Sequence, residues 1–249
     1  MIDRKFIVKR SPLSYLVLGV VLLATIALGG FAFFRVNAPT PTASAIPSGG
    51  NLAVSSDERT KVVVYGDSIS VGDSPAFSSQ QLGKRAWPYY LSENGVYFIG
   101  GYAMGGATTG NILEQNRCQS GLRAPVTVAA FGTNSLQTGE SFEANLLNLE
   151  RLKSECNAEL RPEAFIVTAV GPGNTIPQEK VTDWNARLKT AAEQRGWTFA
   201  DPFSGMRTPE NTWLPGLSFD GLHPTEAAAK TYAANIAPVI ISAGKQSAG

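Results

Sequence analysis

Short apolar runs alternate with helix-like stretches along most of this chain, and this alternation restricts the fold more than any other feature. The runs are rich in β-branched and aromatic residues, which predicts five strands, at 61–66, 96–102, 124–132, 164–171 and 197–202. Several runs are apolar almost throughout, as buried parallel strands are, and the segments between them are long enough for crossover helices. The alternation therefore predicts an α/β domain of three layers with a mostly parallel sheet.

Two of the intervening segments have the clearest helical pattern. They are 142–156 and 181–196, and Gly196 supplies a C-terminal stop for the second. In sheets of this kind the working residues gather at the carboxyl ends of the strands. Polar residues that directly follow a predicted strand are therefore the first candidates for a functional site.

The N-terminal part of the chain predicts a membrane anchor. Residues 13–34 are 22 consecutive residues without a charge, and as a helix they would extend about 33 Å, enough to cross a bilayer core. Four basic residues precede them, so the positive-inside rule places residues 1–12 in the cytoplasm and the rest of the chain outside. This describes a single-pass protein of the cell membrane. The alternative is secretion after cleavage near Ala45, where small residues resemble a signal-peptide site.

Residues 35–59 are rich in Pro, Thr, Ser and Gly and predict a flexible linker ahead of a domain at 60–249.

The net charge of +1 on the whole chain hides an uneven distribution of charge. Five of the 21 basic residues and one of the 20 acidic residues lie within 1–35, so the remainder holds 16 basic and 19 acidic residues. A net charge of −3 on the remainder argues against a nucleic-acid partner.

A candidate nucleophile directly follows the first predicted strand, in the tripeptide Gly66-Asp67-Ser68. A strand-to-helix turn at this point would hold the hydroxyl of Ser68 exposed above the sheet. The start of the following helix would offer N–H groups and a positive dipole end to a developing oxyanion. The tripeptide is also common in turns and helix caps, so by itself it does not indicate an enzyme.

The partners that such a serine needs lie near the other end of the chain. His223 is the only histidine, and imidazole is the side chain suited to take a proton from a hydroxyl near neutral pH. Asp220 lies three residues earlier, within reach of the imidazole Nδ1–H in a tight turn. The alternative is that His223 only precedes the last helix, with Pro224 in its first turn, and the two interpretations are compatible.

Two further strand ends offer donors for an oxyanion hole. Gly106 follows the second strand, and its N–H can approach a substrate without a Cβ in the way. Asn134 follows the third strand, and its side-chain amide can donate to a tetrahedral intermediate. Each residue alone is more often part of a turn.

Together, Ser68, Gly106, Asn134 and His223 occur in an order that resembles the SGNH hydrolases, also called the GDSL esterases and lipases. This resemblance implies a flavodoxin-like sheet in the order 2-1-3-4-5. It also implies that Ser68 is the nucleophile and that Asp220 and His223 are its catalytic partners. The oxyanion donors would be the N–H groups of Ser68 and Gly106 and the side chain of Asn134.

The chain departs from the family pattern in two places within the region of resemblance, which covers roughly 61–240. Ser135 stands where the third block usually has Asp after Asn, and this change removes a hydrogen-bonding group that helps to pose the loop. Ile69 replaces Leu in the first block, which is conservative. In the second block, Gly106 fits the family pattern better than Gly105.

The two cysteines occur in parallel phrases, because Cys118 and Cys156 each precede an arginine by five residues and then a predicted strand. If those strands are neighbours, both sulfur atoms lie near the amino edge of the sheet, where a disulfide is plausible in an oxidising exterior. Two free buried cysteines are the alternative. A zinc or other metal site is not expected, because the chain lacks a Cys-x-x-Cys spacing and has one histidine.

The sequence thus predicts a serine esterase that needs no cofactor and hydrolyses carboxylic esters through an acyl-Ser68 intermediate. No apolar lid is evident, which favours short acyl groups, such as acetyl on glycans. Five aromatic or apolar residues near the motifs are candidates for the lining of a pocket, although residues of this kind more often pack in the core or against helices: Trp87, Tyr89, Trp213, Leu217 and Phe219. The alternatives are an O-acyltransferase with the same catalytic residues and a non-catalytic binding module of the cell envelope.

Overall fold

The computed structural model describes residues 58–247, except 116, 119–121, 123 and 157–163. The predicted cytoplasmic tail at 1–12, the predicted membrane helix at 13–34 and nearly all of the predicted linker lie outside the described residues, as does the alternative cleavage point at Ala45. Within the described part of the chain, no helix has the length and apolar character needed to cross a membrane.

The five predicted strands form one parallel sheet in the order β2-β1-β3-β4-β5, which is the order that the family resemblance implies. Their bounds are β1 Thr60–Gly66, β2 Val96–Ala103, β3 Val126–Ala130, β4 Ala164–Thr168 and β5 Thr198–Ala200. The observed β3, β4 and β5 end before the predicted strands do. The buried apolar residues that follow β3 and β4, such as Phe131 and Val170, belong to the segments at the carboxyl edge. Ala169 still donates its N–H to the Ala200 carbonyl of β5 at 2.8 Å.

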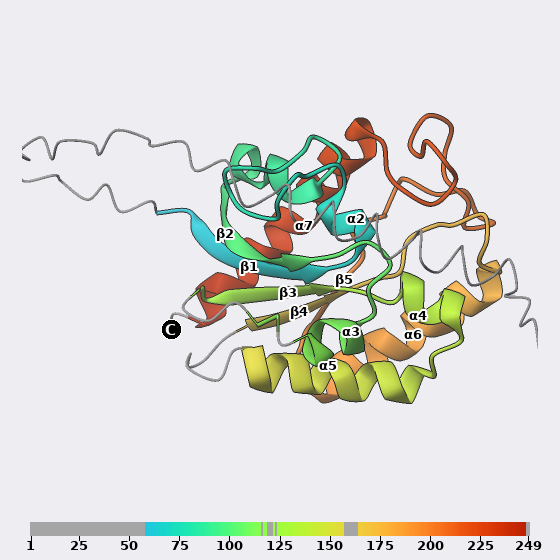
Figure 1. Cartoon of the computed structure of the whole chain (residues 1–249), viewed down its shortest axis with the longest axis horizontal. Coiled ribbons are helices and arrows are strands. Elements are labelled where there is room, and N and C mark those ends of the chain that lie inside the picture. Colours follow the sequence, from blue (N-terminus) through green and yellow to red (C-terminus); the bar gives the residue numbers. More distant parts are fainter. Residues whose placement is uncertain (1–57, 116, 119–121, 123, 157–163, 248–249) are drawn as a thin grey trace, which may run out of the picture. The chain divides into compact units, whose positions relative to one another are not determined.

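Helices cover both faces of the sheet (Figure 1). The helical elements are α2 Ser68–Val71, η2 Trp87–Asn94, α3 Thr109–Glu114, α4 Thr133–Thr138, α5 Phe142–Cys156, α6 Gln178–Gln194 and α7 Glu226–Ser247. The inner strand β1 shows how the layers form. Val62 and Val64 face the core shared with α7 and η2, whereas Val63 and Tyr65 face the core shared with α3, α5 and α6. This alternation follows from the two-residue period of a strand.

The helical predictions agree with the structure over most of their length. The helix predicted at 142–156 is α5, and the helix predicted at 181–196 lies within α6 and the turn that ends it at Gly196, where φ is +65°. The last helix, α7, contains Pro238 and continues to Ser247. The interior of α7 packs against the core through a run of alanines and isoleucines.

The two cysteines lie at the amino edge of the sheet. Cys118 follows α3 and Cys156 is the last residue of α5, and the strands that follow them are paired, with Val126 opposite Ala164. The structure joins the two sulfur atoms in a disulfide, with the Cα atoms 4.8 Å apart. The bridge therefore links the segments that enter β3 and β4, away from the carboxyl edge.

Candidate active site

The turn between β1 and α2 presents Ser68 at the carboxyl end of a central strand. Asp67 is the N-cap of α2, and its Oδ1 accepts a hydrogen bond from the Ile69 N–H at 3.0 Å. Its main-chain carbonyl accepts from the N–H groups of Ser70 and Val71 at 3.1 and 3.0 Å. α2 is a single turn of four residues, so its dipole is small. The hydrogen bonds of Asp67 fix the turn, and Ser68 remains partly exposed within it.

The structure brings Ser68, His223 and Asp220 into one chain of hydrogen bonds. His223 Nε2 lies 2.9 Å from Ser68 Oγ, and His223 Nδ1 lies 2.6 Å from Asp220 Oδ2. Because the carboxylate accepts a hydrogen bond from the Nδ1–H, the neutral imidazole carries its proton on Nδ1 and leaves Nε2 as the acceptor that faces the serine hydroxyl. This is the geometry that a serine needs in order to lose its proton during attack on a carbonyl.

Asp220 is held in its ionised form by the same turn. Its Oδ1 accepts from the main-chain N–H groups of Leu222 at 2.9 Å and His223 at 2.7 Å. Partial desolvation works to raise the pKa of Asp220, but the hydrogen bonds from the His223 ring and from these N–H groups outweigh it and lower the pKa to about 2. Asp220 is therefore a carboxylate over the whole range in which the imidazole can act as a base.

The loop that carries His223 is closed on itself. The Ser218 hydroxyl donates to the His223 carbonyl at 2.7 Å and accepts from the Gly221 N–H at 2.9 Å. Gly221 has a φ of +84°, a conformation that glycine adopts without strain. Its carbonyl accepts from the Asn174 N–H at 2.9 Å, which ties the loop to the segment after β4. These contacts set the position of the imidazole.

Phe219 lies against the catalytic histidine. The two rings are stacked with their centroids 5.9 Å apart, and the guanidinium of Arg85 lies 4.7 Å from the Phe219 centroid. Phe219 is 55% exposed and borders the site, which agrees with its candidacy as a pocket residue and not with packing in the core. Trp87 and Trp213 are buried in the core, in line with their interpretation as packing residues.

Gly106 and Asn134 come together at the carboxyl edge. Gly106 has a φ of +73° in a turn closed by the hydrogen bond from the Ala107 N–H to the Met104 carbonyl at 3.2 Å. Asn134 Nδ2 donates to the Ala107 carbonyl at 2.9 Å, so the turn that contains Gly106 is tied directly to the predicted oxyanion donor.

The second amide hydrogen of Asn134 is directed to Asp67. The distance from Asn134 Nδ2 to Asp67 Oδ2 is 3.3 Å, longer than the bond to the Ala107 carbonyl. Both donors of the amide are therefore engaged. To bind an oxyanion, Asn134 would have to exchange this longer hydrogen bond for a shorter bond to the substrate.

Asp67 is a part of the site that sequence reasoning missed. Asp67 is only 2% exposed. Burial raises the pKa of its carboxyl to about 7, although the hydrogen bond from the Ile69 N–H and the electrostatic effect of His223 act to lower it. The signal was present in the Gly-Asp-Ser tripeptide. Nothing in the tripeptide, however, states how deeply the carboxyl is buried or which residue it meets.

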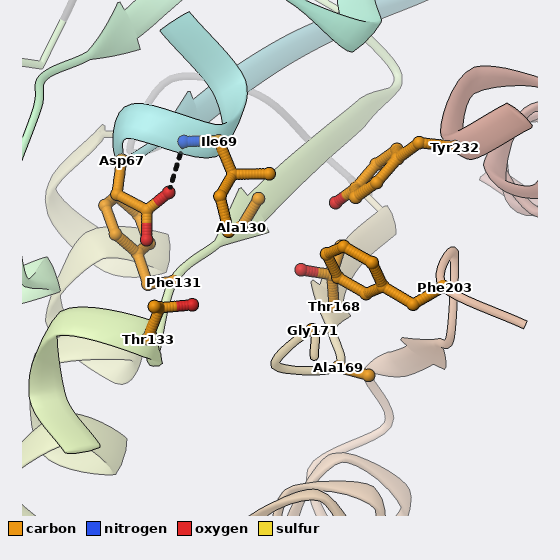
Figure 2. A pocket seen from close by; sticks show the side chains of 10 residues that line it. All are labelled: Asp67, Ile69, Ala130, Phe131, Thr133, Thr168, Ala169, Gly171, Phe203 and Tyr232. Carbon is orange, nitrogen blue, oxygen red and sulfur yellow. Dashed lines mark hydrogen bonds between the residues drawn. The ribbon is translucent and has the colours of Figure 1, made fainter. Parts of the chain in front are cut away.

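A small cavity lies beneath Asp67. Figure 2 shows the Asp67 carboxylate and the hydroxyls of Thr133, Thr168 and Tyr232 pointing into it from opposite sides. Its volume of about 10 Å³ is on the scale that one water molecule needs. Ligand pockets are usually about 300–1,000 Å³, so this cavity is too small for an acyl chain.

The fold and these contacts define the class of protein. A nucleophile just after an inner strand of the sheet, a histidine base and a carboxylate that orients the histidine describe an α/β serine hydrolase. Among the described residues, no group of three or more His, Cys, Asp or Glu side chains could hold a metal ion.

Residues 64–230 match the model of the GDSL-like lipase/acylhydrolase family, so the chain belongs to this family, and the resemblance drawn from its motifs is confirmed. No protein of curated function is significantly similar to it in sequence.

Several solved structures share the fold. A lipolytic protein of the G-D-S-L family from Desulfitobacterium hafniense is 15% identical, with 72% of this chain and 99% of that chain covered and a TM-score of 0.61. An acylhydrolase from Bacteroides fragilis is 22% identical, with 74% and 88% covered and a TM-score of 0.57. An acetyl-xylooligosaccharide esterase from Geobacillus is 14% identical, with 73% and 94% covered and a TM-score of 0.56.

Proposed function

We propose that this GDSL-family hydrolase is a membrane-anchored, extracytoplasmic esterase that removes short acyl groups, such as acetyl, from glycans. The observation that carries the chemistry is the chain of hydrogen bonds from Ser68 Oγ to His223 at 2.9 Å and from His223 to Asp220 at 2.6 Å. The proposal adds a substrate class and a location to the esterase chemistry of the family.

The reaction would proceed in two halves. Ser68 Oγ attacks the ester carbonyl while its proton moves to His223 Nε2, and Asp220 stabilises the imidazolium that forms. The imidazolium then protonates the leaving alcohol, and an acyl-Ser68 ester remains. In the second half, His223 takes a proton from water, and the resulting attack releases the acid and restores Ser68.

The preference for short acyl groups rests on the sequence, in which no apolar lid is evident, and the proposal of a glycan as the leaving alcohol rests on the openness of the site. The side chain of His223 is 30% exposed and that of Asp220 is 40% exposed, so a bulky alcohol such as a glycan can approach. The esterase from Geobacillus, which is named for acetylated xylooligosaccharides, illustrates that this fold accommodates such substrates.

The proposed location rests on the sequence alone. The uncharged stretch at 13–34 and the basic residues before it favour a single span with the hydrolase domain outside the cytoplasm. Reporter fusions at each end of the full-length chain would test this topology. An N-terminus that is accessible from outside would contradict the proposed orientation. A soluble product cut near Ala45 would identify a secreted protein.

The catalytic proposal is tested with the full-length chain in detergent micelles. We expect hydrolysis of p-nitrophenyl acetate to exceed that of the decanoate, and acetate to be released from acetylated xylooligosaccharides. Ser68→Ala and His223→Ala should each reduce kcat by about 10⁴-fold or more. The exposed Ser92→Ala variant is the matched control and should keep full activity.

Two outcomes would replace the proposal. A folded chain that neither hydrolyses these esters nor reacts with a fluorophosphonate at Ser68 would be a binding module. Acetyl transfer to an added sugar in preference to release as acetate would identify an O-acyltransferase with the same nucleophile.

A further inference from the structure

Ser135, the residue next to the predicted oxyanion donor, is fully buried and needs a partner for its hydroxyl. Its Oγ lies 2.5 Å from Glu140 Oε2, and the Glu140 N–H donates to the Ser135 carbonyl at 2.9 Å. The two contacts close a ring around the end of α4. Gly139 makes this return of the chain possible with a φ of +76°.

The carboxylate of Glu140 continues this ring into α5. Its Oε1 accepts from Asn148 Nδ2 at 3.2 Å. One turn earlier in α5, the buried Asn145 accepts through its Oδ1 from the Thr109 hydroxyl at 3.2 Å, and Ser135 Oγ lies 3.5 Å from the same oxygen. The network therefore connects the start of α3, the start of α4, which carries Asn134, and α5.

This network reaches the two segments that carry the predicted oxyanion donors Gly106 and Asn134. Thr109 follows the turn that contains Gly106, and Ser135 follows Asn134 directly. A hydrogen bond to a carboxylate is about twice as strong as one between neutral groups, so Glu140 is the strongest acceptor that the buried hydroxyl meets here. Removal of the carboxylate would leave that hydroxyl with the longer contact to Asn145.

We infer that Glu140 is a positioning residue for the oxyanion hole. Its carboxylate, acting through Ser135, anchors the start of α4, which carries Asn134, and supplies a hydrogen-bonding group there in place of the Asp that the family pattern has at 135. The inference rests on the proposed ester hydrolysis for its kinetic readout. It goes beyond that function by assigning a role to a residue that does not touch substrate.

The test compares Glu140→Ala, Ser135→Asp and the double variant in the full-length chain with p-nitrophenyl acetate. A misplaced catalytic group costs up to about 100-fold, so we expect Glu140→Ala to lower kcat by about 10- to 100-fold with KM changed less than about threefold. Ser135→Asp should also lose activity, because it places a second carboxylate beside Glu140. The double variant has one carboxylate again and should recover most of kcat.

Glu143→Ala is the matched control, because Glu143 lies three residues away on the exposed surface and pairs with Arg187. It should keep the kcat of the unmodified chain. An unchanged kcat in Glu140→Ala would overturn the inference. So would a double variant no more active than Glu140→Ala.

A readout independent of activity separates this inference from the proposed function. The side-chain amide of Asn134 gives a pair of NMR signals. Their rate of hydrogen exchange reports how firmly the hydrogen bonds at the start of α4 hold this amide. We expect at least about tenfold faster exchange in Glu140→Ala and recovery in the double variant. Unchanged exchange would overturn the inference. An unmodified chain without esterase activity would overturn only the proposed function.

Discussion

His223 Nε2 lies 2.9 Å from Ser68 Oγ, although the two residues are 155 positions apart in the chain. Ser68 is the first residue of α2, just after the first strand of the chain, whereas His223 belongs to the loop before the last helix. Their contact therefore requires the complete sheet and the packing of α7 on it. Catalytic competence and the folded state of the domain should be lost together.

Asp220→Asn tests the role of the carboxylate. The asparagine keeps an acceptor for the Leu222 and His223 N–H groups, but its NH₂ can face the imidazole Nδ1 and favour the wrong tautomer, which places the proton on Nε2. We expect kcat for p-nitrophenyl acetate to fall by about 10³- to 10⁴-fold with a small change in KM. The exposed Asp183→Asn is the control, and a loss below tenfold in Asp220→Asn would contradict the assigned role.

Asn134→Ala tests the oxyanion donor. Removal of one such donor typically costs about 10²- to 10³-fold in kcat, because the interaction is strongest in the transition state. The same loss is expected here, with KM nearly unchanged. Gln137→Ala, an exposed amide in the same helix, should have no effect. If Asn134→Ala changed KM and left kcat intact, Asn134 would be a ground-state contact.

Asp67 should make the domain less stable as the pH rises from about 4 to about 7. In this range the unfolded chain releases the proton at its ordinary pKa of 3.8, whereas the buried carboxyl keeps it until about pH 7. The native state therefore binds more protons, and the free energy of unfolding falls with rising pH, by up to about 4 kcal/mol across the window.

Urea unfolding between pH 4 and pH 8 measures this slope. Asp67→Asn cannot titrate and should flatten it. Asp220 does not interfere, since its lowered pKa confines its contribution to acid pH, where stability is lost as the pH falls from about 4 to about 2. Should Asp67→Asn not fold, a carbon NMR titration of the Asp67 carboxyl gives its pKa directly. A midpoint near 4 would refute the prediction.

The disulfide between Cys118 and Cys156 stays a prediction with a direct test. It closes a loop of 38 residues. On the chain-entropy model, closing a loop of this length stabilises the folded state by about 4 kcal/mol. Cys118→Ser/Cys156→Ser should lower the free energy of unfolding by about this amount and leave kcat intact, because the bridge lies at the edge of the sheet away from the site. Thiol titration of the unfolded, unreduced chain should find no free thiol, and two free thiols would exclude the bridge.

Much of the architecture could be predicted from local sequence. All five strands and α5 were located from apolar runs and helical periodicity, because strand and helix each repeat over a few residues. The candidate nucleophile, Ser68, and its partner, His223, were found because each follows a recognisable local pattern. The ends of β3 and β4 were predicted too late, since apolar residues in buried loops look like strand residues in a sequence.

What the sequence by itself determined is therefore the order of the strands and helices along the chain, the motifs at the strand ends and the pairing of Asp220 with His223 in one tight turn. Only the tertiary structure decided that Asp67 is buried against Asn134, that Phe219 stacks on His223, and that Glu140 reaches Ser135 within a network anchored on α5. The physical reason is that periodicity and turn formation depend on neighbours in the chain. Burial, desolvation and hydrogen-bond partners depend on segments that meet only when the sheet has closed.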